Sequence, residues 1–194
     1  MLDLDNTLYA YDPCHRFALK SAHQFYRTTV APVSLRYFLD SYAHARKKVH
    51  ALLQGQAASH SRLLYFQVLL ENEAGVSQPA QALKLEQAYW RAFFKKMKLA
   101  KWVKPFFTYC RAQRKKIGIV TNLTTAIQMK KLIQFGLARK IDFLVTSEEA
   151  GAEKPHPRIL RLALQKARVS AHDAVMIGDD EKSDRMAGID LIRV

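Results

Sequence analysis

The chain has 194 residues, about half of them apolar and a quarter charged, and its net charge is +14 at pH 7. This length suits one domain or a core domain with a smaller insertion, and the composition excludes a disordered or fibrous protein. The two cysteines, Cys14 and Cys110, form no CxxC pair, which disfavours a disulfide framework and a structural zinc site. A reducing compartment such as the cytoplasm is therefore expected.

The sequence predicts neither a membrane span nor a signal peptide. No run of about eighteen apolar residues occurs, and Asp3 and Asp5 stand where a secretory signal needs a basic segment and an apolar core. Only two residues precede the acidic motif, and the chain stops within an apolar run at residues 190–194. We therefore expect the natural protein to extend further.

In chain order, residues 1–9 predict a short strand that ends in a turn. Residues 13–100 contain no convincing strand, and Pro and Gly divide them into four predicted helices, at about residues 14–30, 34–53, 59–74 and 79–97. From residue 115 onward strands and helices alternate. Apolar runs predict strands at residues 117–121, 141–146, 174–178 and 190–194, and helical spacing follows Thr124 and Pro157.

Strand–helix–strand repeats of this kind build a parallel sheet that is covered on both faces. The predicted fold class is therefore α/β, with a Rossmann-like parallel sheet core and an inserted all-helical domain. We assign residues 1–12 and 101–194 to the core and residues 13–100 to the insertion.

The first polar motif is Asp-Leu-Asp-Asn-Thr at residues 3–7. Side chains alternate along a strand, so Asp3 and Asp5 share a face, and a turn after Leu4 would direct both carboxylates into one crevice. Two anions this close repel unless a cation lies between them, and carboxylates with open positions suit Mg²⁺. An aspartate can also attack phosphorus to form an aspartyl-phosphate. A pair of helix N-caps is the alternative, and it accounts poorly for two acids so near the chain start.

Two further motifs are weak when they are taken alone. Thr121 and Asn122 follow a presumed strand, where a hydroxyl can donate to a phosphoryl oxygen, although a Thr-Asn turn is common. Lys154 precedes Pro155 and is therefore held extended. A rigidly placed ammonium can neutralise both a phosphate and a nucleophilic carboxylate, whereas a surface lysine in a loop is the simpler alternative.

The last motif places Asp179, Asp180 and Asp184 directly after the apolar run at residues 174–178. This spacing suits a metal-binding turn. An acidic surface loop is the alternative, but the chain has only 17 acids, so three aspartates within six residues are notable. All four motifs lie at the carboxyl ends of presumed strands, where open parallel sheets place their active sites.

Together, DLDNT at residues 3–7, VTN at 120–122, EKPHP at 153–157 and GDDEKSD at 178–184 resemble the haloacid dehalogenase (HAD) superfamily of phosphohydrolases. The order of the motifs is that of the family, and the helical insertion resembles its C1-type cap. The resemblance covers nearly the whole chain. It rests on motifs in the core and only on the helical pattern of the sequence in the cap. It implies a Mg²⁺-dependent phosphatase that works through an aspartyl-phosphate.

The resemblance also implies roles for individual residues. Asp3 would be the nucleophile, and Asp5 would be the general acid and then the general base. Thr121 and Lys154 would hold the transferring phosphoryl group, and Asn122 would help to bind the substrate. Dehalogenase members lack the second acid of the first motif, so the presence of Asp5 favours phosphate chemistry.

The metal ligands are implied in the same way. Asp179 would bind Mg²⁺, and Asp184 would support it directly or through water. Asp3 and the backbone carbonyl of Asp5 would complete the set, with Asp180 as a nearby supporting acid.

The substrate is less well defined by the sequence. Residues 13–100 carry thirteen Lys or Arg and four Asp or Glu, which favours a substrate with negative charge beyond its phosphate. A small phosphate ester ranks first and a phosphoprotein bearing phosphotyrosine second. The alternative from another class is a non-catalytic basic module that binds nucleic acid or anionic membrane lipid, and the absence of a nucleic-acid motif disfavours nucleic acid as a partner.

Overall fold

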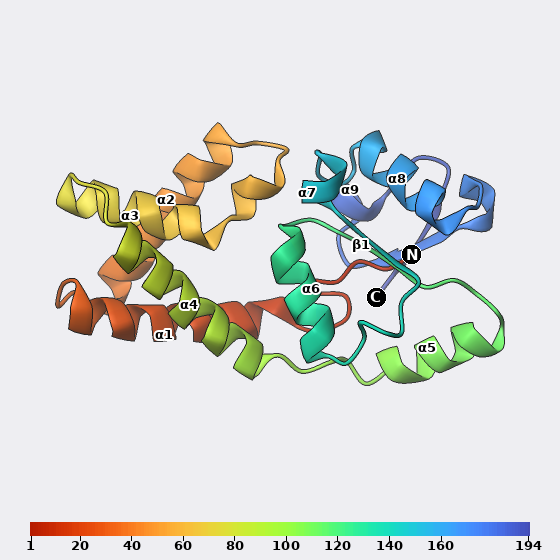
Figure 1. Ribbon diagram of the computed structural model, residues 1–194, viewed down its shortest axis with the longest axis horizontal. Coiled ribbons are helices and arrows are strands. Elements are labelled where there is room, and N and C mark those ends of the chain that lie inside the picture. Colours follow the sequence, from red (N-terminus) through yellow and green to blue (C-terminus); the bar gives the residue numbers. More distant parts are fainter. The chain divides into compact units, whose positions relative to one another are not determined.

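The computed structural model describes all residues from Met1 to Val194, and the chain divides into two compact units. The first comprises Met1–Tyr11, Gly55–Ala57 and Lys98–Val194, and the second comprises Asp12–Gln54 and Ala58–Met97. The first unit contains every strand, and the second is helical (Figure 1). The domain boundaries after residues 12 and 100 remain a prediction. No helix is long and apolar enough to cross a membrane.

The first unit is built on a parallel sheet. Strand β1 (Gly118–Thr121) pairs with β2 (Phe143–Thr146), and β3 (Val175–Gly178) pairs with β4 (Asp190–Arg193). Every residue of β1 is buried, as expected for a strand that is covered on both faces. All four strands lie within the predicted apolar runs, and the predicted Rossmann-like α/β fold is confirmed.

The N-terminal segment joins the two strand pairs. Leu2 forms parallel bridges with both Ile119 of β1 and Ile177 of β3, so this segment lies between β1 and β3. The Leu2 N–H donates to the Gly118 carbonyl at 2.8 Å, and the Asp3 N–H donates to the Ile177 carbonyl at 2.9 Å. The predicted first strand is thus reduced to an isolated bridge at Leu2, because only Leu2 pairs with both β1 and β3.

Helices cover the sheet of this unit. Helix α8 begins at Pro157, whose fixed backbone suits a first turn, and packs on β1 and β2, while α5 lies on the other side of β1 in Figure 1. The apolar core between α8 and the strands is formed by Val120, Val145, Ile159, Leu160, Ala163, Met176, Met186 and Ile189. The helices are α5 (Val103–Ala112), α6 (Thr125–Gln134), α7 (Ser147–Ala150), α8 (Pro157–Ala167) and α9 (Glu181–Asp184), with a 3₁₀ turn at Ala171–Asp173.

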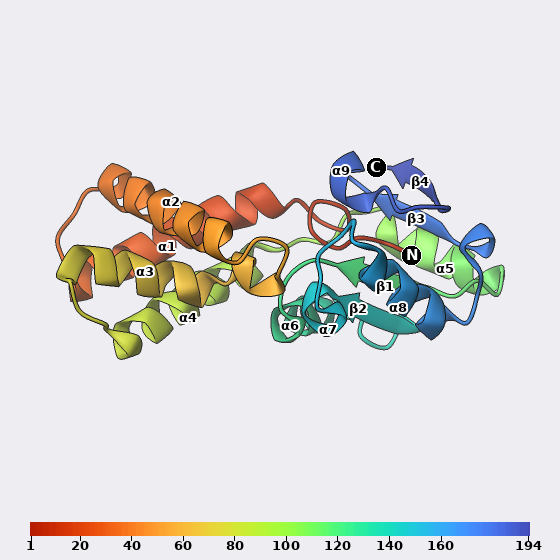
Figure 2. The same cartoon turned by 90° about the horizontal axis from the view of Figure 1, so that it is seen from above.

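The second unit contains four helices, which Figure 2 shows from above. Ser34 and Ser61 cap α2 and α3, because their hydroxyls accept hydrogen bonds from backbone N–H groups in the first turn. Helix α3 packs against both α2 and α4, and its Phe66 is fully buried among aromatic rings. The helices are α1 (Tyr11–Thr29), α2 (Leu35–Leu52), α3 (Arg62–Ala74) and α4 (Pro79–Lys96), with a 3₁₀ turn at Ala57–His60. They match the four predicted segments to within a few residues.

Candidate active site

The first motif forms a tight turn directly after the central segment of the sheet. Asn6 adopts a left-handed backbone conformation with φ of 62°, which Asn tolerates better than most residues. The Leu8 N–H donates to the Leu4 carbonyl at 3.0 Å. The turn brings Thr7 back, so that its hydroxyl lies 3.3 Å from an oxygen of Asp3 and 3.3 Å from an oxygen of Asp179.

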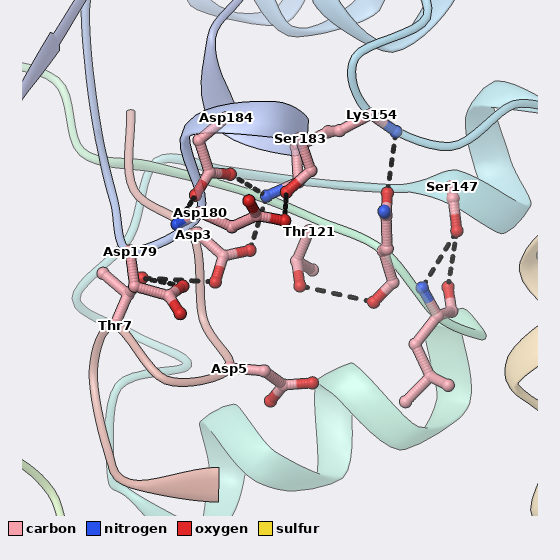
Figure 3. Close-up of polar contacts among 12 residues, drawn as sticks. Asp3, Asp5, Thr7, Thr121, Ser147, Lys154, Asp179, Asp180, Ser183 and Asp184 are labelled. Atoms are coloured by element: carbon pink, nitrogen blue, oxygen red, sulfur yellow. Dashed lines mark hydrogen bonds and ion pairs between the residues drawn. The ribbon is translucent and has the colours of Figure 1, made fainter. Parts of the chain in front are cut away.

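Three carboxylates gather at this end of the sheet. One oxygen from each of Asp3, Asp179 and Asp184 lies within 4.8 Å of the others. Asp3 follows the central segment, Asp179 follows β3, and Asp184 ends α9; Figure 3 shows the three side chains converging. Gly178 makes this approach possible, because a Cβ there would stand 2.0 Å from Oδ2 of Asp184.

Lys154 supplies a positive charge within this group. Its ammonium lies 2.5 Å from Oδ1 of Asp3 and 2.5 Å from Oδ1 of Asp184, and its side chain is buried. Burial opposes the charge, but the carboxylates of Asp3 and Asp184 outweigh it and raise the pKa of Lys154 above its ordinary value. The two carboxylates thus favour the charged form of Lys154, whose ammonium is held against the carboxylate of Asp3.

Two acids of this group, Asp3 and Asp179, resist ionisation. Burial raises the pKa of Asp3 to about 6, although the charge of Lys154 opposes the shift, and Asp184 and Asp5 add to it. Burial also raises the pKa of Asp179. The donor set is three carboxylates with one ammonium among them, so the residues fit a divalent cation with a preference for oxygen, such as Mg²⁺.

Thr121 and Asn122 lie at the carboxyl end of β1, as predicted. Thr121 is buried, and its hydroxyl accepts a hydrogen bond from the Gln128 amide at 2.7 Å. The side-chain oxygen of Asn122 accepts from the backbone N–H of Lys154 at 2.8 Å. Asn122 thus holds the loop that carries Lys154, and its expected contact with substrate stays a prediction.

Asp5 is placed differently from the expectation. We expected its carboxylate to share one crevice and one cation with Asp3, but the group of three acids does not include it. Instead Lys131 of α6 donates to both oxygens of Asp5 at 2.7 Å, and the Tyr9 hydroxyl donates to Oδ1 at 2.5 Å. In Figure 3 the Asp5 carboxylate points toward α6. A metal contact through its backbone carbonyl stays a prediction.

Asp180 lies beside the group of three acids and caps the short helix that ends at Asp184. Its side chain caps α9 by accepting hydrogen bonds from the Lys182 N–H at 3.0 Å and the Ser183 hydroxyl at 2.9 Å. These bonds lower its pKa. Asp180 therefore shapes the turn that carries Asp184, and its carboxylate is not part of the group of three.

Comparison with known proteins decides the family. A model of the haloacid dehalogenase-like hydrolases matches residues 1–191. The chain is 39% identical over 184 residues to a ribulose-1,5-bisphosphate 5-phosphatase of Halopiger xanaduensis, covering 95% of this chain and 77% of that protein. The chain belongs to the haloacid dehalogenase-like hydrolases.

Other relatives agree with this assignment. A phosphoserine phosphatase of Thermus thermophilus is 27% identical, with 97% of this chain and 85% of that protein covered. The magnesium-bound HAD-hydrolase YfnB of Bacillus subtilis has the same fold, with a TM-score of 0.70 at 21% identity, covering 98% of this chain and 85% of that chain. The predicted HAD phosphohydrolase, an enzyme that hydrolyses phosphate monoesters, is confirmed, while the C1 type of the cap stays a prediction.

Sequence reasoning missed three side chains at this HAD site. Thr7 was already in the first motif, but its contact with Asp3 and Asp179 depends on the turn at Asn6. Gln128 and Lys131 lie three residues apart, on one face of a helix that begins directly beyond β1. That polar pair was the available signal, and its placement next to the second motif could have indicated the site.

Proposed function

We propose that this HAD phosphatase hydrolyses a small phosphate monoester with Mg²⁺, through an aspartyl-phosphate on Asp3. The observation that carries the proposal is the buried Asp3 carboxylate, which Lys154 contacts at 2.5 Å and which faces Asp179 and Asp184. A nucleophilic carboxylate next to a fixed cation and a set of metal-binding oxygens is the arrangement that phosphoryl transfer requires.

The chemistry divides into two steps. An oxygen of Asp3 bonds to phosphorus while the bond between phosphorus and the leaving oxygen breaks, and Asp5, which enters this step protonated, gives its proton to that oxygen. A water oxygen then bonds to phosphorus, Asp5 takes a proton from the water, and the bond between Asp3 and phosphorus breaks. The products are the alcohol and inorganic phosphate, and Asp3 and Asp5 return to their initial states.

Other side chains of the site stabilise the charge of the phosphoryl group. The Lys154 ammonium and the Thr121 hydroxyl would hold its oxygens, and Thr7 would orient Asp3 through the contact at 3.3 Å. Mg²⁺ bound by Asp3, Asp179 and Asp184 would supply the positive charge that lets a phosphate dianion approach a carboxylate.

Relatives guide the proposed substrate class. The two phosphatases compared above are named for ribulose-1,5-bisphosphate and phosphoserine, which are small and carry charge beyond one phosphoryl group. The excess of Lys and Arg over acids in residues 13–100 suits such anions. We therefore place ribulose-1,5-bisphosphate first in a substrate panel, followed by phosphoserine, with a phosphotyrosine peptide as the test of a protein substrate.

The test is hydrolysis of para-nitrophenyl phosphate and of the panel, with and without Mg²⁺, by the wild type, Asp3→Asn and Asp173→Asn. Asp173 is an exposed acid that is hydrogen-bonded to Ser170, away from the group of three, and its variant controls for loss of one carboxylate. We expect Mg²⁺-dependent turnover that only Asp3→Asn abolishes. Equal turnover by Asp3→Asn and the wild type would remove Asp3 as the nucleophile.

A further inference from the structure

A second buried lysine, Lys131, contacts Asp5, the other acid of the first motif. This lysine lies on α6, outside the four motifs, and its side chain has no exposed surface. Its ammonium contacts both oxygens of Asp5 at 2.7 Å. A buried ammonium is costly unless it is paired and hydrogen-bonded, so the pairing with Asp5 is a built feature of this site.

The surroundings hold this pair in one orientation. The Tyr9 hydroxyl donates to Oδ1 of Asp5 at 2.5 Å, and the Lys131 ammonium lies 5.9 Å from the ring centres of both Tyr9 and Tyr11. Aromatic faces at this distance attract a cation. The carboxylate of Asp5 is therefore restrained by groups from its own turn and from α6.

Gln128 links this pair to the predicted phosphoryl site. It lies one helical turn before Lys131, is fully buried, and donates to the Thr121 hydroxyl at 2.7 Å and to the Asn122 carbonyl at 2.8 Å. Its amide nitrogen also lies 3.5 Å from Oδ2 of Asp5. One face of α6 thus connects the carboxylate of Asp5 to the end of β1.

Each acid of the first motif is therefore paired with its own lysine, and the two lysines come from different parts of the chain. Lys154 contacts Asp3 and Asp184, whereas Lys131 contacts Asp5. With its own ammonium, Asp5 need not compete with Asp3 for Lys154 or for a metal. The Asp5 side chain also keeps 28% of its surface exposed, which leaves it room to reach a leaving group or a water.

We propose that Lys131 is a positioning residue, which holds the Asp5 side chain apart from Asp3 and orients it for both of its proton transfers, to the leaving oxygen and from the attacking water. This inference rests on the proposed function. Lys131 acts only through Asp5, so its loss should impair the protonation of the alcohol and leave the attack by Asp3 intact.

Two esters with different leaving groups separate a defect in protonation of the leaving oxygen from a defect in the attack by Asp3. A nitrophenolate departs readily without a proton, whereas an alkoxide needs general acid catalysis, which contributes about 10²–10⁴-fold. The experiment compares kcat/KM for para-nitrophenyl phosphate and for an alkyl phosphate that the wild type hydrolyses. We expect Lys131→Met to lose about 10–100-fold more on the alkyl ester than on the nitrophenyl ester, and Lys131→Arg, which retains the charge, to restore part of that difference.

Controls keep the test independent of folding and of the proposed function. Lys130→Met removes an exposed lysine from the same helix and should leave both rates unchanged. Tyr9→Phe removes a hydroxyl that donates to Asp5 and should shift the ratio of the two rates in the same direction, and Lys131→Gln tests the inference at Lys131 itself if Lys131→Met does not fold. Equal losses on both esters in Tyr9→Phe and in a folded Lys131→Met or Lys131→Gln, or no loss, would overturn it. Failure of the proposed function is distinct, because Asp3→Asn would then be as active as the wild type.

Discussion

Replacement of Gly178 by alanine tests the acidic group through sterics alone. The new Cβ would stand 2.0 Å from Oδ2 and 2.4 Å from Cγ of Asp184, so the Asp184 side chain must move. That carboxylate accepts hydrogen bonds from Lys154 at 2.5 Å and from the Asp180 N–H at 3.2 Å. Its displacement should open the group of three acids without the removal of any charge.

The expected cost of Gly178→Ala has two parts. Overpacking costs about 1–3 kcal/mol, and a lost hydrogen bond to a charged group costs about 1.5–3 kcal/mol. Because movement of Asp184 relieves some of the clash, we expect a total near 2–4 kcal/mol in the free energy of unfolding. Loss of a metal-supporting partner typically lowers affinity about 10–100-fold, so the Mg²⁺ concentration for half-maximal activity should rise by at least that factor.

Gly118→Ala is the matched control. A Cβ at Gly118 would stand 2.0 Å from the ring of Phe143, which is an equally severe clash in β1 and β2 but involves no acid. Denaturant unfolding should show a loss of about 1–3 kcal/mol for this variant, with the half-maximal Mg²⁺ concentration unchanged. If Gly178→Ala loses stability as Gly118→Ala does and yet keeps the wild-type dependence on Mg²⁺, the assignment of Asp184 to the metal site is wrong.

Two further predictions concern the helical unit. Burial, together with the charges of Arg62 and Arg46, lowers the pKa of His15 to about 4, so the folded chain excludes a proton that the unfolded chain binds below about pH 6.5. Stability should therefore be lost as pH falls from about 6.5 toward 4, by roughly 3 kcal/mol, and a series of denaturant titrations should show a weaker pH dependence in His15→Gln. Phe66 is fully buried against Tyr42 and Tyr89, so Phe66→Ala should lose about 3–5 kcal/mol in denaturant unfolding. Loss of less than about 1 kcal/mol, as expected for the exposed Phe17→Ala, would contradict the packing described for Phe66.

The fold was predictable where local pattern decides the structure. The apolar run at residues 117–121 is followed by turn-forming residues, and β1 lies within it. Pro157 opens a helix as its chemistry requires. The N-terminal strand was less predictable, because the extent of a strand depends on its partners, and Leu2 alone bridges β1 and β3.

The site was predictable where the motif residues follow strand ends. Asp3, Asp179 and Asp184 converge because parallel strands end at one edge of the sheet. The role of Lys131 was not predictable from periodicity, since a lysine on a helix is ordinarily solvated and its partner, Asp5, lies 126 residues away in sequence. Burial of that ammonium is a property of the tertiary structure alone.

The most direct test of the account is to identify the residue that carries the phosphoryl group. Asp5→Asn lacks the base for the second step, so it should accumulate the acyl phosphate when given para-nitrophenyl phosphate and Mg²⁺. Acid quenching, reduction with borohydride and peptide mass spectrometry then locate the modified residue, because reduction converts an aspartyl-phosphate into homoserine. The account predicts homoserine at position 3. Homoserine at another aspartate, or rapid turnover with position 3 never modified, would contradict it.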